Sequence, residues 1–422
     1  MEENRRINQK NRDSWITIGF TAFLIYVTYS FAKDQVVLGN MNDYAAHTTS
    51  ILSLFRSDEW WKGFMAVPHC MWHLTVLFFY EILQFPMEAA AGYATALYTA
   101  FYYLVLIWAI RKVTAYVGEM EGTVRANVLA TGFCLLQALY VYWMDAGERY
   151  LGTFSMNPLH NPTQMSVRGF AILCFCLTVD ILGDWSKEGY QPIFFEIKGN
   201  KYYVKLMVLL LVSTIMKPTF TEVFVPAVAF YMLAVWIRKC ITKKGDAGAY
   251  FAHCLLMLLL ALPSLLFVAI QFLLFFALGG SYGNEGGLII TDFMEVWGLF
   301  SDNVFFSVLL GMAFPIYMLL IDGTYFLKSR MGQIAWLSYF IGFLEAAFWG
   351  EEGNRITHAN FIWPMMSGML LVWLVSLFRL LSLERTRQDT VQQRILVIIG
   401  WCIFTAHVVC GLIFLKLSLM GL

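Results

Sequence analysis

The chain has 422 residues, of which 59% are hydrophobic and only 14% are charged, and its mean hydropathy is +0.62. Soluble domains carry about 25% charged residues, so this composition excludes a soluble protein and indicates one that crosses a membrane several times. The net charge is zero, so the chain offers no basic surface to nucleic acid, which we exclude as a partner.

Apolar runs that can cross a bilayer recur along the whole chain. A helical crossing needs about 20 apolar residues. The runs, in chain order, are 15–33, 89–110, 126–144, 165–185, 203–217, 221–239, 250–278, 303–326, 332–350, 359–381 and 395–417. The sequence therefore predicts an all-α polytopic membrane protein of about 11 transmembrane helices, with residues 1–422 as a single transmembrane domain and no soluble domain.

One further apolar run, 67–85, is interpreted from the distribution of positive charge. If this run does not cross the membrane, 21 of the 29 lysines and arginines fall on one side, as the positive-inside rule requires of the cytoplasmic side. If it did cross, every later loop would change sides and the bias would be lost. We therefore predict a cytoplasmic N-terminus, an external C-terminus, and interfacial helices within a first external loop, 34–88.

The external segments of this topology carry the residues with catalytic potential. The inner loops hold lysine and arginine and little else, whereas the outer segments mix acids, bases, histidines and asparagines. A channel or flippase more often places such residues near the bilayer centre, so this distribution favours an enzyme working at the outer leaflet. The candidate site residues are Asp43, His47, His73, Glu148, Arg149, His160, Asn161, Lys217, Glu352, Arg355, His358 and Asn360.

Asp43 is the first choice among these residues for a catalytic role. It follows the first predicted crossing directly, and His47 comes four residues later, which places both side chains on one face of a helix. His69 and His73 share the same spacing, but we assign no metal to them. Glu345 is interpreted either as a buried partner of Arg355 or as part of the site.

Four features of the outer side resemble the GT-C superfamily of integral-membrane glycosyltransferases, and within it the multi-span bacterial proteins found with surface-polysaccharide genes. The layout extends over about the whole chain, and the individual motifs are short. The features are Asp43 with His47 after the first span, Pro68-His69 with His73, His160-Asn161-Pro162-Thr163 followed later by Lys217-Pro218, and Glu352-Gly353-Asn354-Arg355 leading to Asn360-Phe361-Ile362-Trp363.

The resemblance implies an enzyme of the bacterial inner (plasma) membrane that takes a sugar from a polyprenyl-phosphate carrier. The acceptor would be a glycan or glycolipid on the outer face, and Asp43 would be the base. Direct displacement with a single base predicts inversion at the sugar carbon. The sequence has no clear Asp-x-Asp motif, so no cofactor is assigned, and a divalent cation is left open.

The remaining candidates are assigned to donor and substrate binding. Arg355 is the first candidate for the carrier phosphate, because cationic donors stabilise a departing phosphate, and Lys217, Arg149 and His358 come next. Asn161 and Asn360 can hydrogen-bond sugar hydroxyls. Trp363 and Trp349 are interpreted either as stacking platforms for a sugar or as members of the aromatic belt at the membrane surface.

Two other functions remain open. A polysaccharide or lipid flippase or transporter would explain the number of spans, but it predicts polar residues along a path through the membrane. An O-antigen-type ligase or polymerase would need arginines in outer loops, for which Arg149, Arg168 and Arg355 are available. Release of polyprenyl phosphate from a donor lipid would separate a transferase from a flippase.

Overall fold

A computed structural model of the protein describes residues 2–39, 42–58, 60–67, 69–140, 155–157, 159, 161–186, 190–274, 287–386 and 390–419. Within these residues the chain is almost entirely helical and has one two-stranded sheet. The fold is thus all-α, as the sequence predicts. Glu148, Arg149 and His160 lie outside the described residues.

The first half of the chain contains three long helices, with a group of short helices between the first two. Its elements are α1 Glu2–Leu38, α2 Asp43–Ala46, a π-helical turn His47–Ile51, α3 Leu52–Phe55, α4 Trp61–Ala66, α5 Met71–Leu77, a second π-helical turn Phe78–Ile82, α6 Met87–Tyr116, α7 Thr123–Cys134 and α8 Pro162–Ser186.

The second half is a series of long helices interrupted by the small sheet. Its elements are α9 Lys201–Met216, α10 Thr219–Thr242, α11 Ala247–Phe272, β1 Leu288–Ile290, α12 Glu295–Gly298, α13 Val304–Lys328, α14 Arg330–Phe348, β2 Trp349–Glu351, a 3₁₀ turn Gly353–His358, α15 Ile362–Thr386 and α16 Val391–Leu419.

Eight segments among the described residues are long and apolar enough to cross a membrane. They belong to α1, α6, α8, α10, α11, α13, α15 and α16. The protein is therefore a multi-span membrane protein. Of the remaining predicted crossings, α9 has 16 residues and α14 has 19, and α9 is shorter than the roughly 20 residues that span a bilayer upright. The predicted count of eleven is not established.

The prediction of one continuous helix over 126–144 is wrong. Helix α7 ends at Cys134, and the chain continues to residue 140 without regular secondary structure. Its backbone finds partners on two other helices, because the N–H of Gln137 donates to the carbonyl of His407 (3.2 Å) and the N–H of Leu139 to that of Leu310 (3.1 Å). Non-helical backbone at membrane depth requires such enclosure by protein. The apolar residues of a run do not by themselves show whether the run forms a helix or a non-helical segment enclosed by protein.

Helix α16 approaches this irregular segment very closely. A Cβ atom placed on Gly411 would lie 1.4 Å from the carbonyl oxygen of Leu135. Only glycine can occupy this position, since any side chain would force the two backbones apart. The side chain of His407 adds a further contact, with Nδ1 lying 2.7 Å from the carbonyl oxygen of Gln137.

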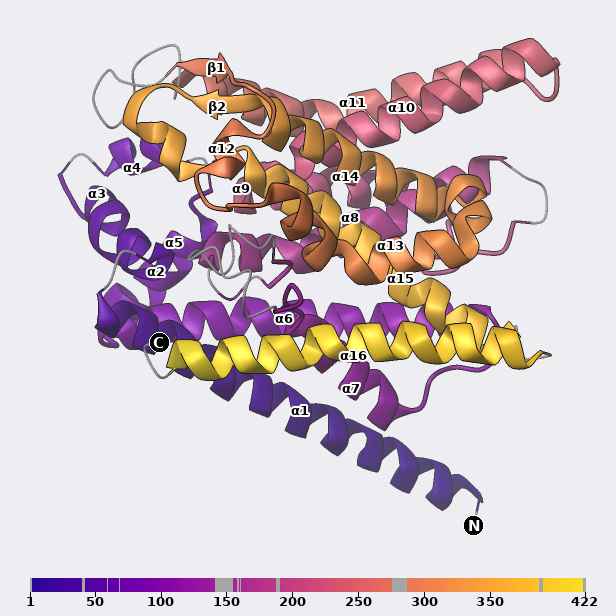
Figure 1. Ribbon diagram of the computed structural model, residues 1–422, viewed down its shortest axis with the longest axis horizontal. Coiled ribbons are helices and arrows are strands. Elements are labelled where there is room, and N and C mark those ends of the chain that lie inside the picture. Colours follow the sequence, from indigo (N-terminus) through magenta and orange to yellow (C-terminus); the bar gives the residue numbers. More distant parts are fainter. Residues whose placement is uncertain are drawn as a thin grey trace.

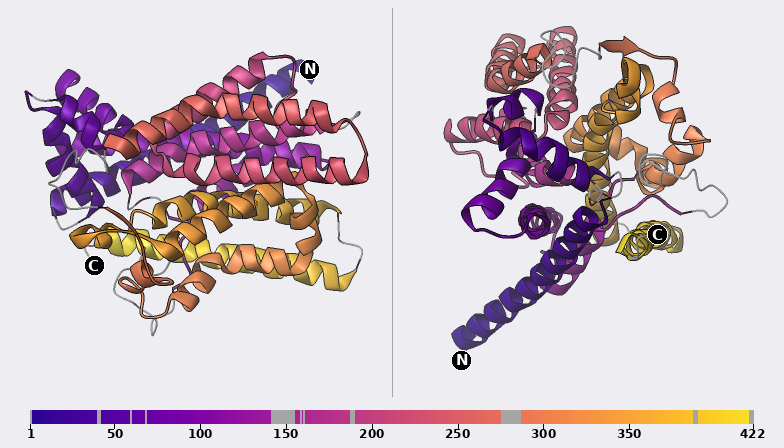
Figure 2. Two further views of the ribbon diagram at one scale, coloured as in Figure 1. Left: turned by 90° about the horizontal axis from the view of Figure 1, so that it is seen from above. Right: turned by 90° about the vertical axis from the view of Figure 1, so that its left-hand side faces the viewer.

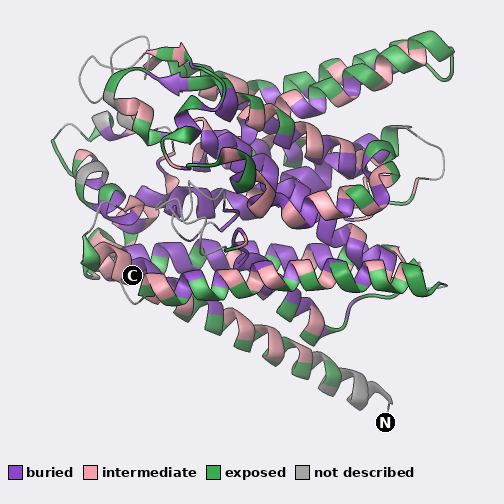
Figure 3. Ribbon diagram, viewed as in Figure 1, coloured by how far each residue is buried: buried purple, intermediate pink, exposed green. Residues whose placement is uncertain are grey.

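The long helices lie roughly side by side, and their burial identifies α15 as the central one (Figures 1 and 3). In the most apolar window of the α15 segment 94% of the residues are buried, against 22% in those of α1 and α11. Helices α14 and α15 pack most closely, because Gly368 places its Cα against the backbone of Ser338 and Tyr339. Small residues permit such close approach in membrane helices.

The short helices α2–α5 gather at one end of the bundle, where α16 also ends, and α1 begins at the opposite end (Figures 1 and 2). Within the 67–85 run, the described residues form α5 and a π-helical turn in this group. The small sheet lies at the same end. Its strands are antiparallel, and Leu288 pairs with Glu351. Which end is external remains a prediction.

Candidate functional site

Asp43 is the first residue of helix α2, and its neighbour Asn42 fixes that position. The side-chain oxygen of Asn42 accepts a hydrogen bond from the N–H of Ala45 (2.8 Å), and its amide nitrogen donates to the carbonyl of Gln35 at the end of α1 (2.9 Å). Asparagine is among the best residues for capping a helix N-terminus in this way. The cap therefore links α2 to α1 and positions the carboxylate of Asp43.

Asn161 brings the start of α8 to this carboxylate. Its side-chain nitrogen donates to Oδ2 of Asp43 (2.8 Å). Its side-chain oxygen accepts from the N–H of Gln164 (2.8 Å) and from Oγ1 of Thr163 (2.9 Å). One amide group thus caps helix α8 and holds the acid of α2, so the two elements are fixed to each other.

Lys217 completes the cluster from the turn between α9 and α10. Its backbone is extended there, because α9 ends at Met216 and Pro218 precedes α10. The buried amine donates to Oγ1 of Thr163 (2.9 Å) and to the side-chain oxygen of Asn161 (3.3 Å), and it lies 4.7 Å from the ring centroid of Trp363 at the start of α15. We call Asp43, Asn161, Thr163 and Lys217 the acid–amine cluster.

The enclosure of the cluster moves both of its ionisable groups toward neutral pH. Burial raises the pKa of Asp43 to about 6, against the opposing effects of the Lys217 charge and the Asn161 hydrogen bond. Burial lowers the pKa of Lys217 to about 7, against the opposing charges of Asp43 and Glu222. Part of the Asp43 surface remains exposed, so a small molecule can reach it. A carboxylate of this kind is suited to proton abstraction near pH 7.

Three histidines lie beside the cluster. Nδ1 of His47 and Nε2 of His73 are 2.9 Å apart, so one ring donates and the other accepts. Burial lowers the pKa of His73 to about 3. Burial, His73 and Lys217 together hold the pKa of His47 well below its usual range, and His69 behaves similarly. All three rings are therefore neutral at physiological pH. No group of three histidine, cysteine or acidic side chains among the described residues is placed to hold a metal ion.

A second polar group follows strand β2. Nη2 of Arg355 donates to one oxygen of Glu351 (2.9 Å), and the side-chain nitrogen of Asn360 donates to the other (2.7 Å). Glu351 is 2% exposed. The side chains of Glu352 and His358 are exposed nearby in the sequence. The segment ends at Trp363, so it joins this second group to the acid–amine cluster.

The structure thus brings Asp43 and Lys217 into contact with the same side chain, that of Asn161, and places His47 and His73 close by. Two contributors do not follow from the sequence analysis, Thr163 and Glu351. Thr163 binds the Lys217 amine, and its position two residues after Asn161 was the available signal. Glu351 was passed over although it precedes Arg355 by four residues, the spacing of a helical ion pair.

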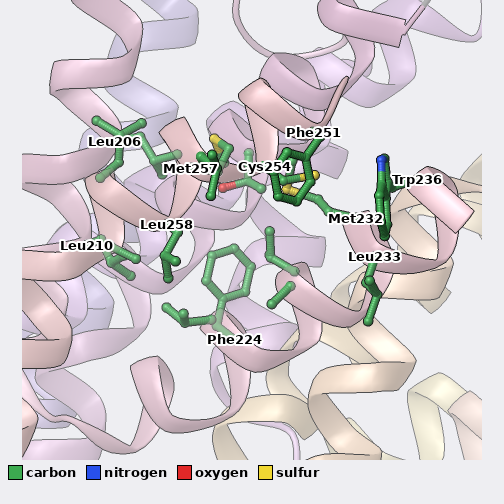
Figure 4. A pocket seen from close by; sticks show the side chains of 17 residues that line it. Leu206, Leu210, Phe224, Met232, Leu233, Trp236, Phe251, Cys254, Met257 and Leu258 are labelled. Carbon is green, nitrogen blue, oxygen red and sulfur yellow. The ribbon is translucent and has the colours of Figure 1, made fainter. Parts of the chain in front are cut away.

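An apolar cavity of about 220 Å³ lies between α8, α9, α10 and α11 (Figure 4). Its wall is almost wholly hydrocarbon and aromatic, and the residues include Leu206, Phe224, Met232, Trp236 and Phe251. Phe224 comes seven residues after Lys217, about two turns along α10, and no residue of the acid–amine cluster lines the cavity.

The fold and the site define a multi-span helical membrane protein with a buried acid–amine cluster at one end of the bundle. No family model matches the chain, and neither the curated proteins nor the solved structures contain a significant match to it.

Proposed function

We propose that the protein is a membrane glycosyltransferase of GT-C type. It would move a sugar from a polyprenyl-phosphate carrier to an acceptor glycan or glycolipid on the outer face of a bacterial inner membrane. The acid–amine cluster is the observation that carries this proposal. It supplies a carboxylate whose pKa is raised to about 6 beside an amine at hydrogen-bonding distance from the same asparagine.

The chemistry needs one base and one cation. The acceptor oxygen forms a bond to the anomeric carbon, and its proton passes to Asp43. The bond between that carbon and the carrier oxygen breaks, and its electron pair leaves with the phosphate. A phosphate is a good leaving group that needs no strong acid but benefits from a nearby positive charge. Attack from the face opposite the phosphate inverts the sugar carbon.

The contacts of Lys217 and Arg355 change which residue is the first candidate for binding the carrier phosphate. Lys217 is buried beside Asp43, whereas Arg355 forms an ion pair with Glu351. We therefore assign the carrier phosphate to Lys217, and Arg355 and Asn360 to positioning the 351–360 segment. Trp363 stacks with the Lys217 amine, which favours a role in holding that amine. Trp349 is 41% exposed and remains the candidate for sugar stacking.

The neutral histidines and the apolar cavity fit the same proposal. Imidazole rings without charge can hydrogen-bond sugar hydroxyls, and His47 and His73 are placed to do so. The cavity opens among membrane helices, so its occupant must be soluble in the bilayer, and a polyprenyl chain attached to a phosphate at Lys217 satisfies this requirement. No soluble donor would need such a surface.

A lipid or polysaccharide transporter is the second candidate function. The observation that favours it is the irregular segment 135–140, because interrupted helices at membrane depth are typical of transporter binding sites. A transporter would move its lipid intact, whereas a transferase releases polyprenyl phosphate.

The test uses the purified full-length protein with a panel of polyprenyl-phosphate sugars, and mass spectrometry detects released polyprenyl phosphate. Asp43→Asn keeps the size of the side chain but removes the proton acceptor, so turnover should fall by about 10²–10⁴-fold. Asp58→Asn, an exposed acid of the same predicted loop, is the matched control and should keep the wild-type rate.

Two results would contradict the proposal. Retention of more than about a tenth of the wild-type turnover by Asp43→Asn would remove that residue as the base. Movement of intact donor lipid across vesicle bilayers, without any release of polyprenyl phosphate by the wild-type protein, would identify a transporter.

A further inference from the structure

Some charged residues within the described long helices have charged or multiple hydrogen-bonding partners. Nε of Arg379 on α15 donates to Oδ2 of Asp322 on α13 (2.6 Å). Asp180 on α8 accepts from the N–H groups of Phe194 (2.8 Å) and Phe195 (2.7 Å). These contacts compensate for the cost of removing the charges from water.

Arg168, in the second turn of α8, is a clear exception. Its side chain is 1% exposed, and only Nη2 has a hydrogen bond, donated to the carbonyl of Met156 (2.6 Å). Nε and Nη1 have no hydrogen-bond partner among the described residues. The guanidinium carbon lies 5.8 Å from the ring centroid of Tyr102 on α6. The surroundings thus offer this cation a carbonyl and an aromatic ring but no described carboxylate.

The neighbours of Arg168 add further unused donors. The buried hydroxyl of Tyr102 interacts with the Arg168 guanidinium but makes no hydrogen bond of normal geometry within the described part of the chain, and the side-chain nitrogen of Asn157, the residue after Met156, has no hydrogen-bond partner there either. Buried polar groups in native proteins are nearly always paired. Two nitrogens of the buried Arg168 guanidinium therefore lack a hydrogen-bond acceptor within the described part of the chain.

We propose that Arg168 and Tyr102 form a binding site for a phosphate-type oxyanion, separate from the acid–amine cluster. Arg168 comes seven residues after Asn161, which places it about 10 Å further along α8 at 1.5 Å per residue. An ionisable group at such depth in a membrane helix marks a functional site by default. The planar guanidinium matches the oxygens of a phosphate, with which it forms paired N–H hydrogen bonds.

The chemistry fits two sources of phosphate, a free ion and a lipid headgroup. The experiment measures thermal unfolding of the full-length protein in detergent with either inorganic phosphate or undecaprenyl phosphate, at constant ionic strength. A ligand that binds only the folded state raises the melting temperature with concentration. A rise with both probes indicates a site for the free ion, and a rise with the lipid alone indicates a headgroup site. Because the carrier phosphate is assigned to Lys217, either rise supports the proposal only where it is weakened by the variants of Arg168 or Tyr102.

Two variants locate the response. Arg168→Met should weaken binding by about 10–100-fold, because hydrogen bonds to a charged group are among the strong ones. Tyr102→Phe retains the ring packing and should weaken binding by about 3–10-fold, which keeps the test valid if Arg168→Met fails to fold. Arg56→Met is the control, because that arginine is exposed and paired with Glu81, and it should respond like the wild type.

Three outcomes would overturn the proposal. The first is the absence of any response of the wild-type protein to either probe. The second is a wild-type response in Tyr102→Phe and in Arg168→Met. The third concerns Asp145 and Glu148, acids in the segment 141–154 that the structure does not describe. If replacing both by their amides lowered the melting temperature as much as Arg168→Met and removed no phosphate response, the counter-ion would belong to the chain itself.

Discussion

Replacing Lys217 by methionine should move the titration of Asp43 by a calculable amount. Asn161 bridges the two groups with hydrogen bonds of 2.8 and 3.3 Å. With that amide between them the charges lie about 7 Å apart, and an effective dielectric constant of about 20 gives an attraction of about 2.4 kcal/mol. One pKa unit corresponds to about 1.36 kcal/mol. Because the positive charge favours the carboxylate, its removal raises the pKa of Asp43 from about 6 to about 8.

Infrared difference spectroscopy measures this shift without any substrate. The band of the protonated carboxyl group is followed against pH and assigned to Asp43 by its loss in Asp43→Asn. Lys205→Met, which removes an exposed lysine of the same helix α9, is the control and should leave the midpoint near the wild-type value. A wild-type midpoint below about 4 would show that the carboxyl is solvated like a model compound. An unchanged midpoint in Lys217→Met would show that the two groups do not interact.

Three further predictions concern topology and stability. Cysteines placed at Gln84 and at Arg111, in a background without the natural cysteines, should be labelled from opposite sides of sealed cells; labelling of both from outside would refute the predicted topology. Gly411→Ala should destabilise the protein by about 3 kcal/mol or more through overpacking. Gly19→Ala is the control, because the added methyl group has open space there, and it should leave the melting temperature unchanged or raise it slightly. Equal melting temperatures of the two variants would contradict the contact between Gly411 and the backbone of Leu135. Arg355→Met should lower stability by about 3 kcal/mol because it leaves a buried carboxylate without its cation, and an unchanged melting temperature would contradict the ion pair.

Most of the long helices could be predicted because burial in lipid and burial in protein select the same apolar residues. The 126–144 run shows where that reasoning stops. The hydrogen bonds of Gln137 and Leu139 go to residues of α16 and α13, which are far away in the sequence. No local pattern in the run reveals these partners, so the sequence predicts a helix over 135–140, where the protein has no regular secondary structure.

The individual residues of the site could be predicted from the sequence, but their positions relative to one another could not. Asp43, Asn161 and Lys217 were each selected as polar residues at the ends of predicted spans, but a single sequence does not tell which span ends are neighbours. The ion pair of Arg355 with Glu351 is different, because its spacing of four residues is visible in the sequence, whereas the sequence analysis offers Glu345 or the carrier phosphate as the partner of this arginine.

The irregular segment at 135–140 also constrains the order in which the chain can fold while it is being synthesised. Gln137 pairs with His407, which lies 270 residues later, and a ribosome adding about 5–20 residues per second needs about 15–55 s to supply that partner. During this interval the N–H of Gln137 cannot form the hydrogen bond that it makes to His407 in the finished protein. Until α16 has been synthesised, this N–H must bond to water, to another part of the chain or to another protein. A chain truncated before α16 should therefore leave this segment as a signal for membrane quality control, even though all residues of the acid–amine cluster have been synthesised.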